Sequence, residues 1–157
     1  MNKFSKKGFS FGLTSAVITT LGLITGLDSS TGSKIVVISG ILTIALADAF
    51  SDALGMHMAV ESEGNRRPAE IWKATSATFL TKLIFALSFL LPFLFLPLDW
   101  AWWLSILWGF AILIFISYRI ARQEKMKPQE VITEHVLIAI LVLILTYYLG
   151  RLIAYYI

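Results

Sequence analysis

Five mostly apolar stretches follow one another along the chain, and short polar connectors separate them. They cover residues 9–27, 35–60, 74–96, 101–118 and 131–157. A helix needs about 20 residues to cross about 30 Å of hydrocarbon, and each stretch is close to or above that length. An open strand would leave backbone groups unpaired in lipid. The pattern therefore predicts an all-α integral membrane protein with five transmembrane helices.

Composition agrees with this prediction. The chain has 157 residues, of which 57% are hydrophobic, and its mean hydropathy is +0.78. Soluble domains are nearer 45–50% apolar, so lipid must cover much of this surface. The connectors are too short to hold a soluble domain, and we expect residues 1–157 to form a single transmembrane domain. Cysteine is absent, which excludes disulfides and thiolate metal ligands.

The basic residues lie mostly on one of the two predicted sides of the membrane. With the N-terminus in the cytoplasm, the outer connectors carry Lys34, and ten basic residues fall on the inner side. These ten are Lys3, Lys6, Lys7, Arg66, Arg67, Lys73, Arg119, Arg122, Lys125 and Lys127. Such asymmetry is typical of membrane topology and explains the net charge of +3 without nucleic acid. The small size and minimal connectors favour a prokaryotic cell membrane, with lipid as the surrounding partner.

The second stretch carries the candidate chemistry. Asp48 lies near its middle, and Asp52 and Met56 follow at intervals of four residues, so the three share one helix face. Carboxylates in a bilayer are costly and need a partner. Two carboxylates and a thioether suit a divalent ion of intermediate hardness, such as Fe²⁺ or Mn²⁺. The alternative is structural, with the acids bonded to hydroxyls or to Lys82. His57 is expected on a different surface.

Several other residues extend this picture. Thr14, Ser15 and Thr19 are possible pore-lining residues on the facing helix, and Glu61, Glu63 and Glu70 form a possible cytoplasmic mouth, or else a solvated mixed-charge loop. Lys82 is expected to snorkel toward the inner interface rather than pair with an acid.

Packing signals are also present. Pro92 predicts a bend in the third span. Small residues recur every four positions in the second span, at Ala47, Ser51, Gly55 and Ala59, and glycines recur in the first span. Such residues let helices approach closely, either between these two spans or across a dimer.

Three stretches of sequence resemble a known family. They are GLTSAVITTLGLITGL at 12–27, ADAFSDALGMHMAVESE at 47–63 and TYYLGRLIA at 146–154. In this order and spacing they resemble the first-span, second-span and closing motifs of the vacuolar iron transporter family. The likeness covers nearly the whole chain. It implies five helices per subunit, a homodimer with the ion path between subunits, and export of Fe²⁺ or Mn²⁺ from the cytoplasm against protons.

The chain departs from the family pattern at the site. Ser15 stands where the family has a first-span acid, and Asp52 and Met56 exchange the family's methionine and acid. Asp48 stands where the family has a small residue. The connector 61–73 replaces the family's cytoplasmic metal-binding domain, so the chain resembles a short form.

The function expected from the sequence is therefore divalent metal transport. Asp48, Asp52 and Met56 are the expected metal ligands, the metal is cargo rather than a cofactor, and protons are the expected coupling ion. The alternative is a non-transporting membrane scaffold or metal sensor with the same fold. We do not expect an enzyme, because the sequence shows no nucleophile–base pair, phosphate loop or His/Glu metal motif.

Overall fold

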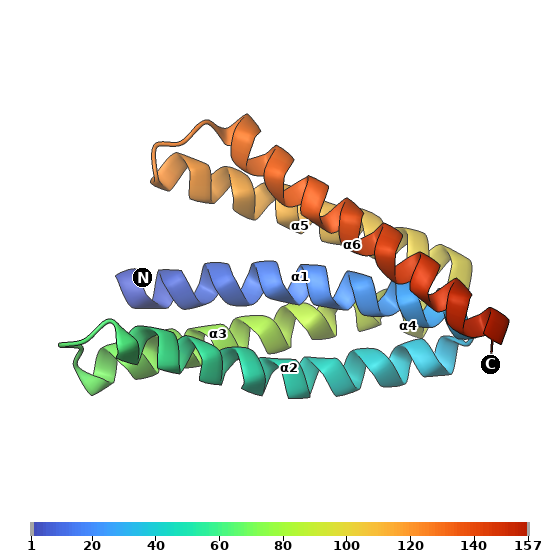
Figure 1. The fold of residues 1–157 in the computed structure, drawn as a ribbon, viewed down its shortest axis with the longest axis horizontal. Coiled ribbons are helices and arrows are strands. Elements are labelled where there is room, and N and C mark those ends of the chain that lie inside the picture. The colour runs from blue at the N-terminus through green and yellow to red at the C-terminus, as the bar shows by residue number, and fades with distance from the viewer. Residues whose placement is uncertain (1, 157) are drawn as a thin grey trace.

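The computed structural model describes residues 2–156 and is all-α, with three long helices along the long axis and two oblique to them (Figure 1). The helices are α1 (Lys3–Thr31), α2 (Lys34–Ser62), α3 (Pro68–Ser88), α4 (Leu90–Phe95), α5 (Leu98–Gln123) and α6 (Pro128–Tyr156). Helices α3 and α4 together form one membrane-length element, Pro68–Phe95. Five helices are therefore long and apolar enough to cross a membrane, which confirms the number and order of the expected spans.

Several helices begin or end outside the apolar stretches, at a capping side chain, a glycine or a proline. The Asn2 side chain accepts a hydrogen bond from the Ser5 N–H at 2.8 Å and so begins α1 six or seven residues before the apolar stretch. Gly32 ends α1 in the left-handed conformation, with φ of 56°. Pro68 and Pro128 stand at the first positions of α3 and α6, where a missing N–H costs nothing.

The third span is interrupted at Phe89, between α3 and α4. Pro92 has no N–H to give to the Ser88 carbonyl four residues earlier, so the helical bonding cannot continue there. This confirms the bend expected at Pro92. The Ser88 hydroxyl accepts a hydrogen bond from the Trp108 indole N–H at 3.0 Å, which ties the break to α5.

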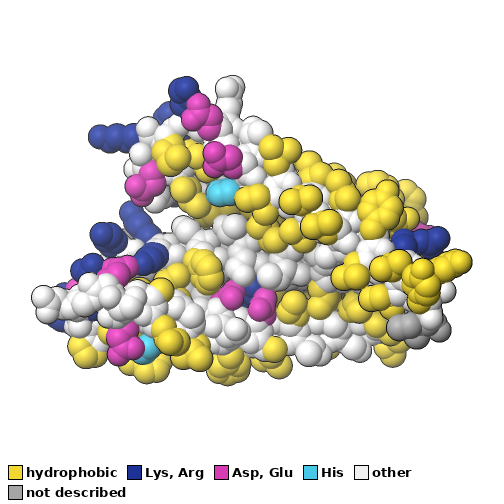
Figure 2. Space-filling view, viewed as in Figure 1, with side chains coloured by type: hydrophobic (Ala, Val, Ile, Leu, Met, Phe, Trp, Pro, Cys, Tyr) yellow, Lys and Arg dark blue, Asp and Glu magenta, His cyan; other side chains and the backbone are white. Residues whose placement is uncertain are grey.

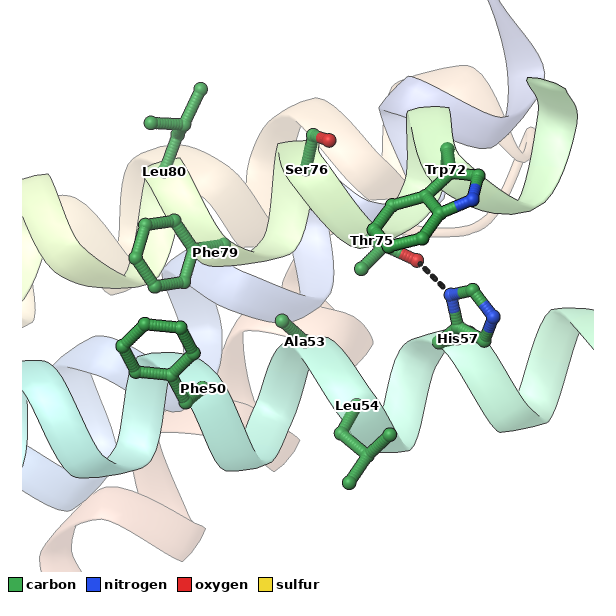
Figure 3. Close-up of a pocket in the computed structure, with 9 residues that line it drawn as sticks. All are labelled: Phe50, Ala53, Leu54, His57, Trp72, Thr75, Ser76, Phe79 and Leu80. Atoms are coloured by element: carbon green, nitrogen blue, oxygen red, sulfur yellow. Dashed lines mark hydrogen bonds between the residues drawn. The ribbon is translucent and has the colours of Figure 1, made fainter.

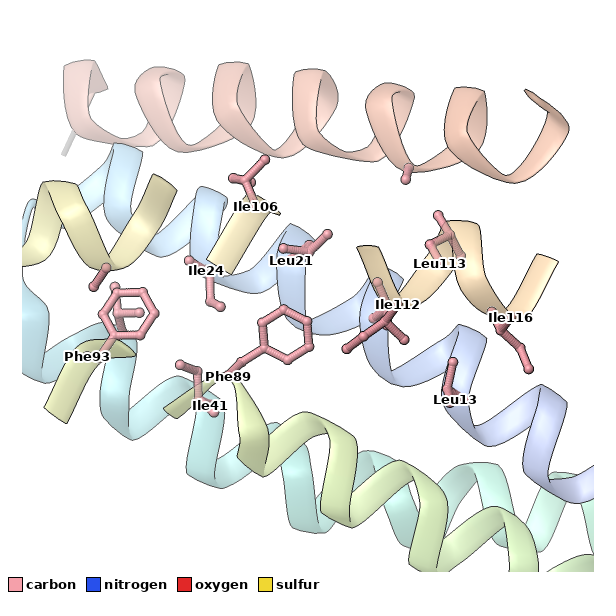
Figure 4. Packing of buried hydrophobic residues seen from close by; sticks show 14 residues of the cluster. Leu13, Leu21, Ile24, Ile41, Phe89, Phe93, Ile106, Ile112, Leu113 and Ile116 are labelled. Atoms are coloured by element: carbon pink, nitrogen blue, oxygen red, sulfur yellow. The ribbon is translucent and has the colours of Figure 1, made fainter. Parts of the chain in front are cut away.

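Helix α1 lies at the centre of the bundle and contacts α2, α3, α5 and α6. Its residues Leu13, Leu21 and Ile24 pack with Phe89 and Phe93 from the broken third span in the main apolar cluster (Figure 4). Helix α6 is the least covered, with only 11% of its most apolar window buried inside the bundle. Its outer side is therefore available to lipid.

The glycines of α1 allow close approach, but not to the helix we expected. Gly8 and Gly12 face α3, and a Cβ at Gly12 would lie 2.7 Å from the Thr78 carbonyl oxygen. Gly22 and Gly26 face α6 at Thr146. The expected pairing of these glycines with the second span is therefore wrong within one chain. The small residues of α2 (Ala47, Ser51, Gly55 and Ala59) are instead exposed.

The two ends of the bundle differ in charge. The N-terminus and the α2–α3 and α5–α6 connectors lie at the same end (Figure 1), and the basic residues expected on the cytoplasmic side belong to these segments. We call this the basic end. The α1–α2 and α4–α5 connectors lie at the opposite end.

The contact between α1 and α3 gives a testable consequence. We expect Gly12→Ala to lower the free energy of unfolding by about 1–3 kcal/mol, because its methyl group would press on the backbone of α3. Gly55→Ala is the matched control, since a Cβ there has no atom within 4 Å and should be neutral or slightly stabilising. Unfolding in detergent micelles measures both; equal stability of the two variants would contradict this packing.

Candidate cation site

A lysine side chain is buried where three membrane helices meet. Lys82, on α3, is almost completely buried, and it is the largest fully buried side chain among the described residues. Its ammonium group lies between the acids of α2 and the hydroxyls of α1. The expectation that Lys82 snorkels is therefore wrong, because oxygen partners at its own depth give the charge a better environment than a stretched path to the interface.

Four oxygens surround the ammonium nitrogen. The Asp48 carboxylate oxygen is 2.6 Å away and that of Asp52 is 3.0 Å away. The Ser15 and Thr19 hydroxyls accept hydrogen bonds at 2.7 and 2.9 Å. The spacing of four residues between the two acids, and between the two hydroxyls, places each pair on one face of its helix. The geometry follows directly from this repeat.

The hydroxyl of Thr19 is oriented by its own helix. It donates to the Ser15 carbonyl at 2.8 Å, which leaves its lone pairs for the Lys82 ammonium. The structure thus brings together two of the three hydroxyls predicted to line a pathway, Ser15 and Thr19. Thr14 is half-buried and forms none of the hydrogen bonds to Lys82.

The cluster has more negative than positive charge. The formal charges of two carboxylates and one ammonium sum to one excess negative charge, and among residues 2–156 no second basic group lies within 4.0 Å of either acid. The acids also lie nearer the surface than the lysine: their side chains are 26% and 17% exposed, against 1% for Lys82.

This charged group lies far from both ends of the molecule. Asp48 is midway between the two ends of α2. In Figure 2, two acidic patches with a small basic patch between them lie near the middle of the visible face, away from the charged ends. A cation that approaches this face of the subunit therefore meets the carboxylates before the ammonium group.

The described residues of the chain do not complete a metal-binding shell. Within residues 2–156, no group of three or more His, Cys, Asp or Glu side chains converges. The present spacing of 2.6–3.0 Å suits an ammonium group, whereas Mg²⁺ and Ca²⁺ bind oxygen at about 2.0–2.6 Å. A divalent cation would therefore have to displace the ammonium and draw the carboxylates inward.

Met56 lies one turn beyond Asp52 but packs in a separate apolar cluster with Val60, Ile71 and Ala74. It is 5% exposed, and this packing accounts for its burial without a metal. Its role as a thioether ligand stays a prediction.

His57 faces away from the cluster, as expected. Its Nδ1 is 3.1 Å from the Thr75 hydroxyl, and its ring lies edge-on to Trp72 at 5.0 Å between centroids (Figure 3). Since the Thr75 hydroxyl donates to the Ile71 carbonyl, the histidine Nδ1–H must donate to Thr75. The surrounding hollow between α2 and α3 is lined mostly by apolar side chains, among them Phe50 and Phe79.

The acids of the predicted cytoplasmic mouth are interleaved with basic groups. Glu63 is paired with Lys7 and Arg66, and Glu70 is paired with Arg67. The hydrogen bond from Lys7, followed by that from Arg66, holds the pKa of the Glu63 carboxyl below its usual value. Glu61 is exposed. This arrangement favours the solvated mixed-charge alternative over an acidic funnel.

No protein-family model matches the chain, and no curated protein matches its sequence. The likeness to the vacuolar iron transporter family therefore stays a prediction, based on the three motifs.

Removing the central cation should have a large effect. We expect Lys82→Met to lower the free energy of unfolding by about 3–5 kcal/mol, because two carboxylates lose their counter-charge in the membrane. Adding Asp48→Asn and Asp52→Asn to that variant should recover part of the loss. Lys73→Met, at an exposed position on the same helix, is the control and should be nearly neutral. Unfolding in detergent micelles measures all of them; wild-type stability of Lys82→Met would show that the ion cluster is not formed.

Proposed function

We propose that the protein is a dimeric membrane transporter that carries a divalent cation, Mn²⁺ or Fe²⁺, out of the cytoplasm in exchange for protons. The basic end faces the cytoplasm in this proposal, by the positive-inside rule, and the membrane is that of a prokaryotic cell. The observation that carries the proposal is the position of Asp48 and Asp52 between a buried lysine and the subunit surface, with one negative charge in excess.

In this proposal Lys82 is an internal counter-ion. When no metal is bound, the ammonium neutralises one carboxylate charge and limits the cost of an empty acidic site in lipid. An arriving divalent cation takes both carboxylates, and the ammonium keeps its contacts with Ser15 and Thr19. When the metal leaves, the ammonium returns to the acids. The ammonium and the metal therefore neutralise the same two carboxylates in turn.

The donor atoms suggest which ion to test first. The cluster offers carboxylate and hydroxyl oxygens, which suit Mn²⁺ better than softer ions. Fe²⁺ would gain from the Met56 thioether only if that side chain left its apolar cluster. Mn²⁺ is therefore the first substrate to test.

A second subunit would complete the site. The exposed small residues of α2, Ala47 and Ser51 among them, lie on the same helix as the half-exposed acids. Small residues on a membrane helix permit close contact with another helix. Two copies packed through α2 would bring two pairs of acids near one another, which supplies the ligands that one subunit lacks.

A second candidate function has its own support. The four oxygens around Lys82 outnumber its three N–H groups, so every donor of the ammonium has an acceptor within the chain. A non-transporting scaffold with this fold would need no more than that.

Uptake of Mn²⁺ into proteoliposomes tests the proposal. We expect wild-type protein to transport Mn²⁺ above the level of protein-free vesicles, and Asp48→Asn with Asp52→Asn to fall to that level. Glu124→Gln with Glu130→Gln, at exposed positions of the α5–α6 connector and its flanks, removes the same charge and should transport normally.

A binding measurement distinguishes loss of the site from failure of the variant to fold. Mn²⁺ at about 100 times its dissociation constant should stabilise wild-type protein by about 2.7 kcal/mol and leave the Asn double variant unshifted. Wild-type uptake by the double variant would reject the site. Wild-type protein that neither transports nor is stabilised by Mn²⁺ or Fe²⁺ would favour the scaffold.

The absence of cysteine makes the dimer directly testable. Ser51→Cys places one thiol on the exposed face of α2, and we expect mild oxidation in membranes to give a disulfide-linked dimer. Leu80→Cys, exposed on α3, is the control and should remain monomeric on denaturing gels. Equal cross-linking at the two positions would contradict packing through α2.

A further inference from the structure

A cleft separates the N-terminal part of α1 from the C-terminal part of α5 at the basic end. These two segments diverge in Figure 1. Two adjoining hollows of about 700 and 450 Å³ lie between them and share Lys6, Ser10, Ile120 and Gln123 in their walls. Because they share these residues, the hollows form one continuous cleft. It is separate from the Lys82 cluster, whose residues do not line it.

Basic side chains gather at the mouth of this cleft. Lys3, Lys6 and Lys7 of α1 line it on one side, and Arg119 of α5 lines it on the other. Figure 2 shows basic side chains around the hollow at this end. Glu124 is the one acid among the lining residues.

Most of this positive charge is not neutralised within the subunit. Lys7 is paired with Glu63. Among residues 2–156, no carboxylate lies within 4.0 Å of the charged groups of Lys3, Lys6 or Arg119. The cleft therefore carries about two to three positive charges that attract an anion.

The second hollow has polar walls formed by Lys6, Ser10 and Arg119, and apolar walls farther from the basic end. Phe9, Phe115 and Ile116 line the second hollow, and Phe115 is 64% exposed. Lys6 precedes the first apolar stretch of the sequence and Arg119 follows the fourth, so both lie at the level of the lipid headgroups. From the basic end inward, the cleft therefore presents basic side chains first and apolar side chains after them.

We propose that this cleft binds one anionic phospholipid, with its phosphate between Lys6 and Arg119 and an acyl chain along Phe115. Basic pockets between membrane helices at this level are suited to lipid headgroups. A water-soluble anion would use the basic mouth but gain nothing from the apolar walls. The lipid holds α1 and α5 at their present separation. This proposal is independent of the proposed transport function.

Native mass spectrometry and thermal unfolding of the purified full chain test the proposal, with phosphatidylglycerol and phosphatidylcholine of the same chains. We expect one phosphatidylglycerol molecule to bind about tenfold more tightly than phosphatidylcholine, and to raise the melting temperature. Lys6→Gln with Arg119→Gln should remove most of this preference.

Two controls make the outcome decisive. Lys73→Gln with Arg122→Gln removes the same charge from exposed positions near the basic end, outside the cleft, and should keep the preference. Glycerol phosphate, which has the headgroup chemistry without acyl chains, should not raise the melting temperature. An equal loss in both double variants, equal binding of the two lipids, or full stabilisation by glycerol phosphate would overturn the proposal.

Discussion

The ammonium group of Lys82 and the carboxylates of Asp48 and Asp52 form the interaction on which the bundle depends most. They join α3 to α2, and the hydroxyls of Ser15 and Thr19 bring in α1. In hydrocarbon, association of helices has no hydrophobic driving force, so packing and polar contacts must supply it. An unpaired charge at this depth costs several kcal/mol, and this arrangement of the three helices pairs the ammonium with both acids. The cluster therefore fixes the register of α1, α2 and α3.

Much of the fold could be predicted from the sequence, because a membrane imposes a length on each apolar stretch and permits few structures. The order of spans and the bend at Pro92 followed from these constraints. The ends of the helices did not, because caps such as Asn2 and the prolines at 68 and 128 extend them into polar sequence. The helices that the α1 glycines contact could not be predicted either, since small residues permit close contact without specifying which helix makes it.

The acids of the candidate site could be predicted from the sequence, and their pairing with Lys82 was the structural alternative rather than the expectation. The repeat of four residues placed Asp48 and Asp52 on one face, and it did the same for Ser15 and Thr19. The expectation that Lys82 snorkels depends only on its distance from the interface. The pairing could have been predicted from the depth of the two residues in the membrane. Lys82 lies eight residues after the start of the third apolar stretch, and Asp52 lies eight residues before the end of the second. In antiparallel neighbouring helices, those two positions lie at the same depth in the membrane. Opposite charges at the same depth in lipid are expected to form an ion pair.

The lysine also bears on how a transport site can be stable when empty. Two carboxylates alone at mid-membrane would hold a divalent cation strongly but would be costly without it. An internal ammonium lowers that cost, and any metal must then compete with a group that is always present. The competition weakens binding, which a transporter needs in order to release its cargo. It also requires the ammonium to stay nearby, and the hydroxyls of Ser15 and Thr19 provide that second position. In a scaffold without transport, the same two hydroxyls would instead complete the hydrogen bonding of the ammonium.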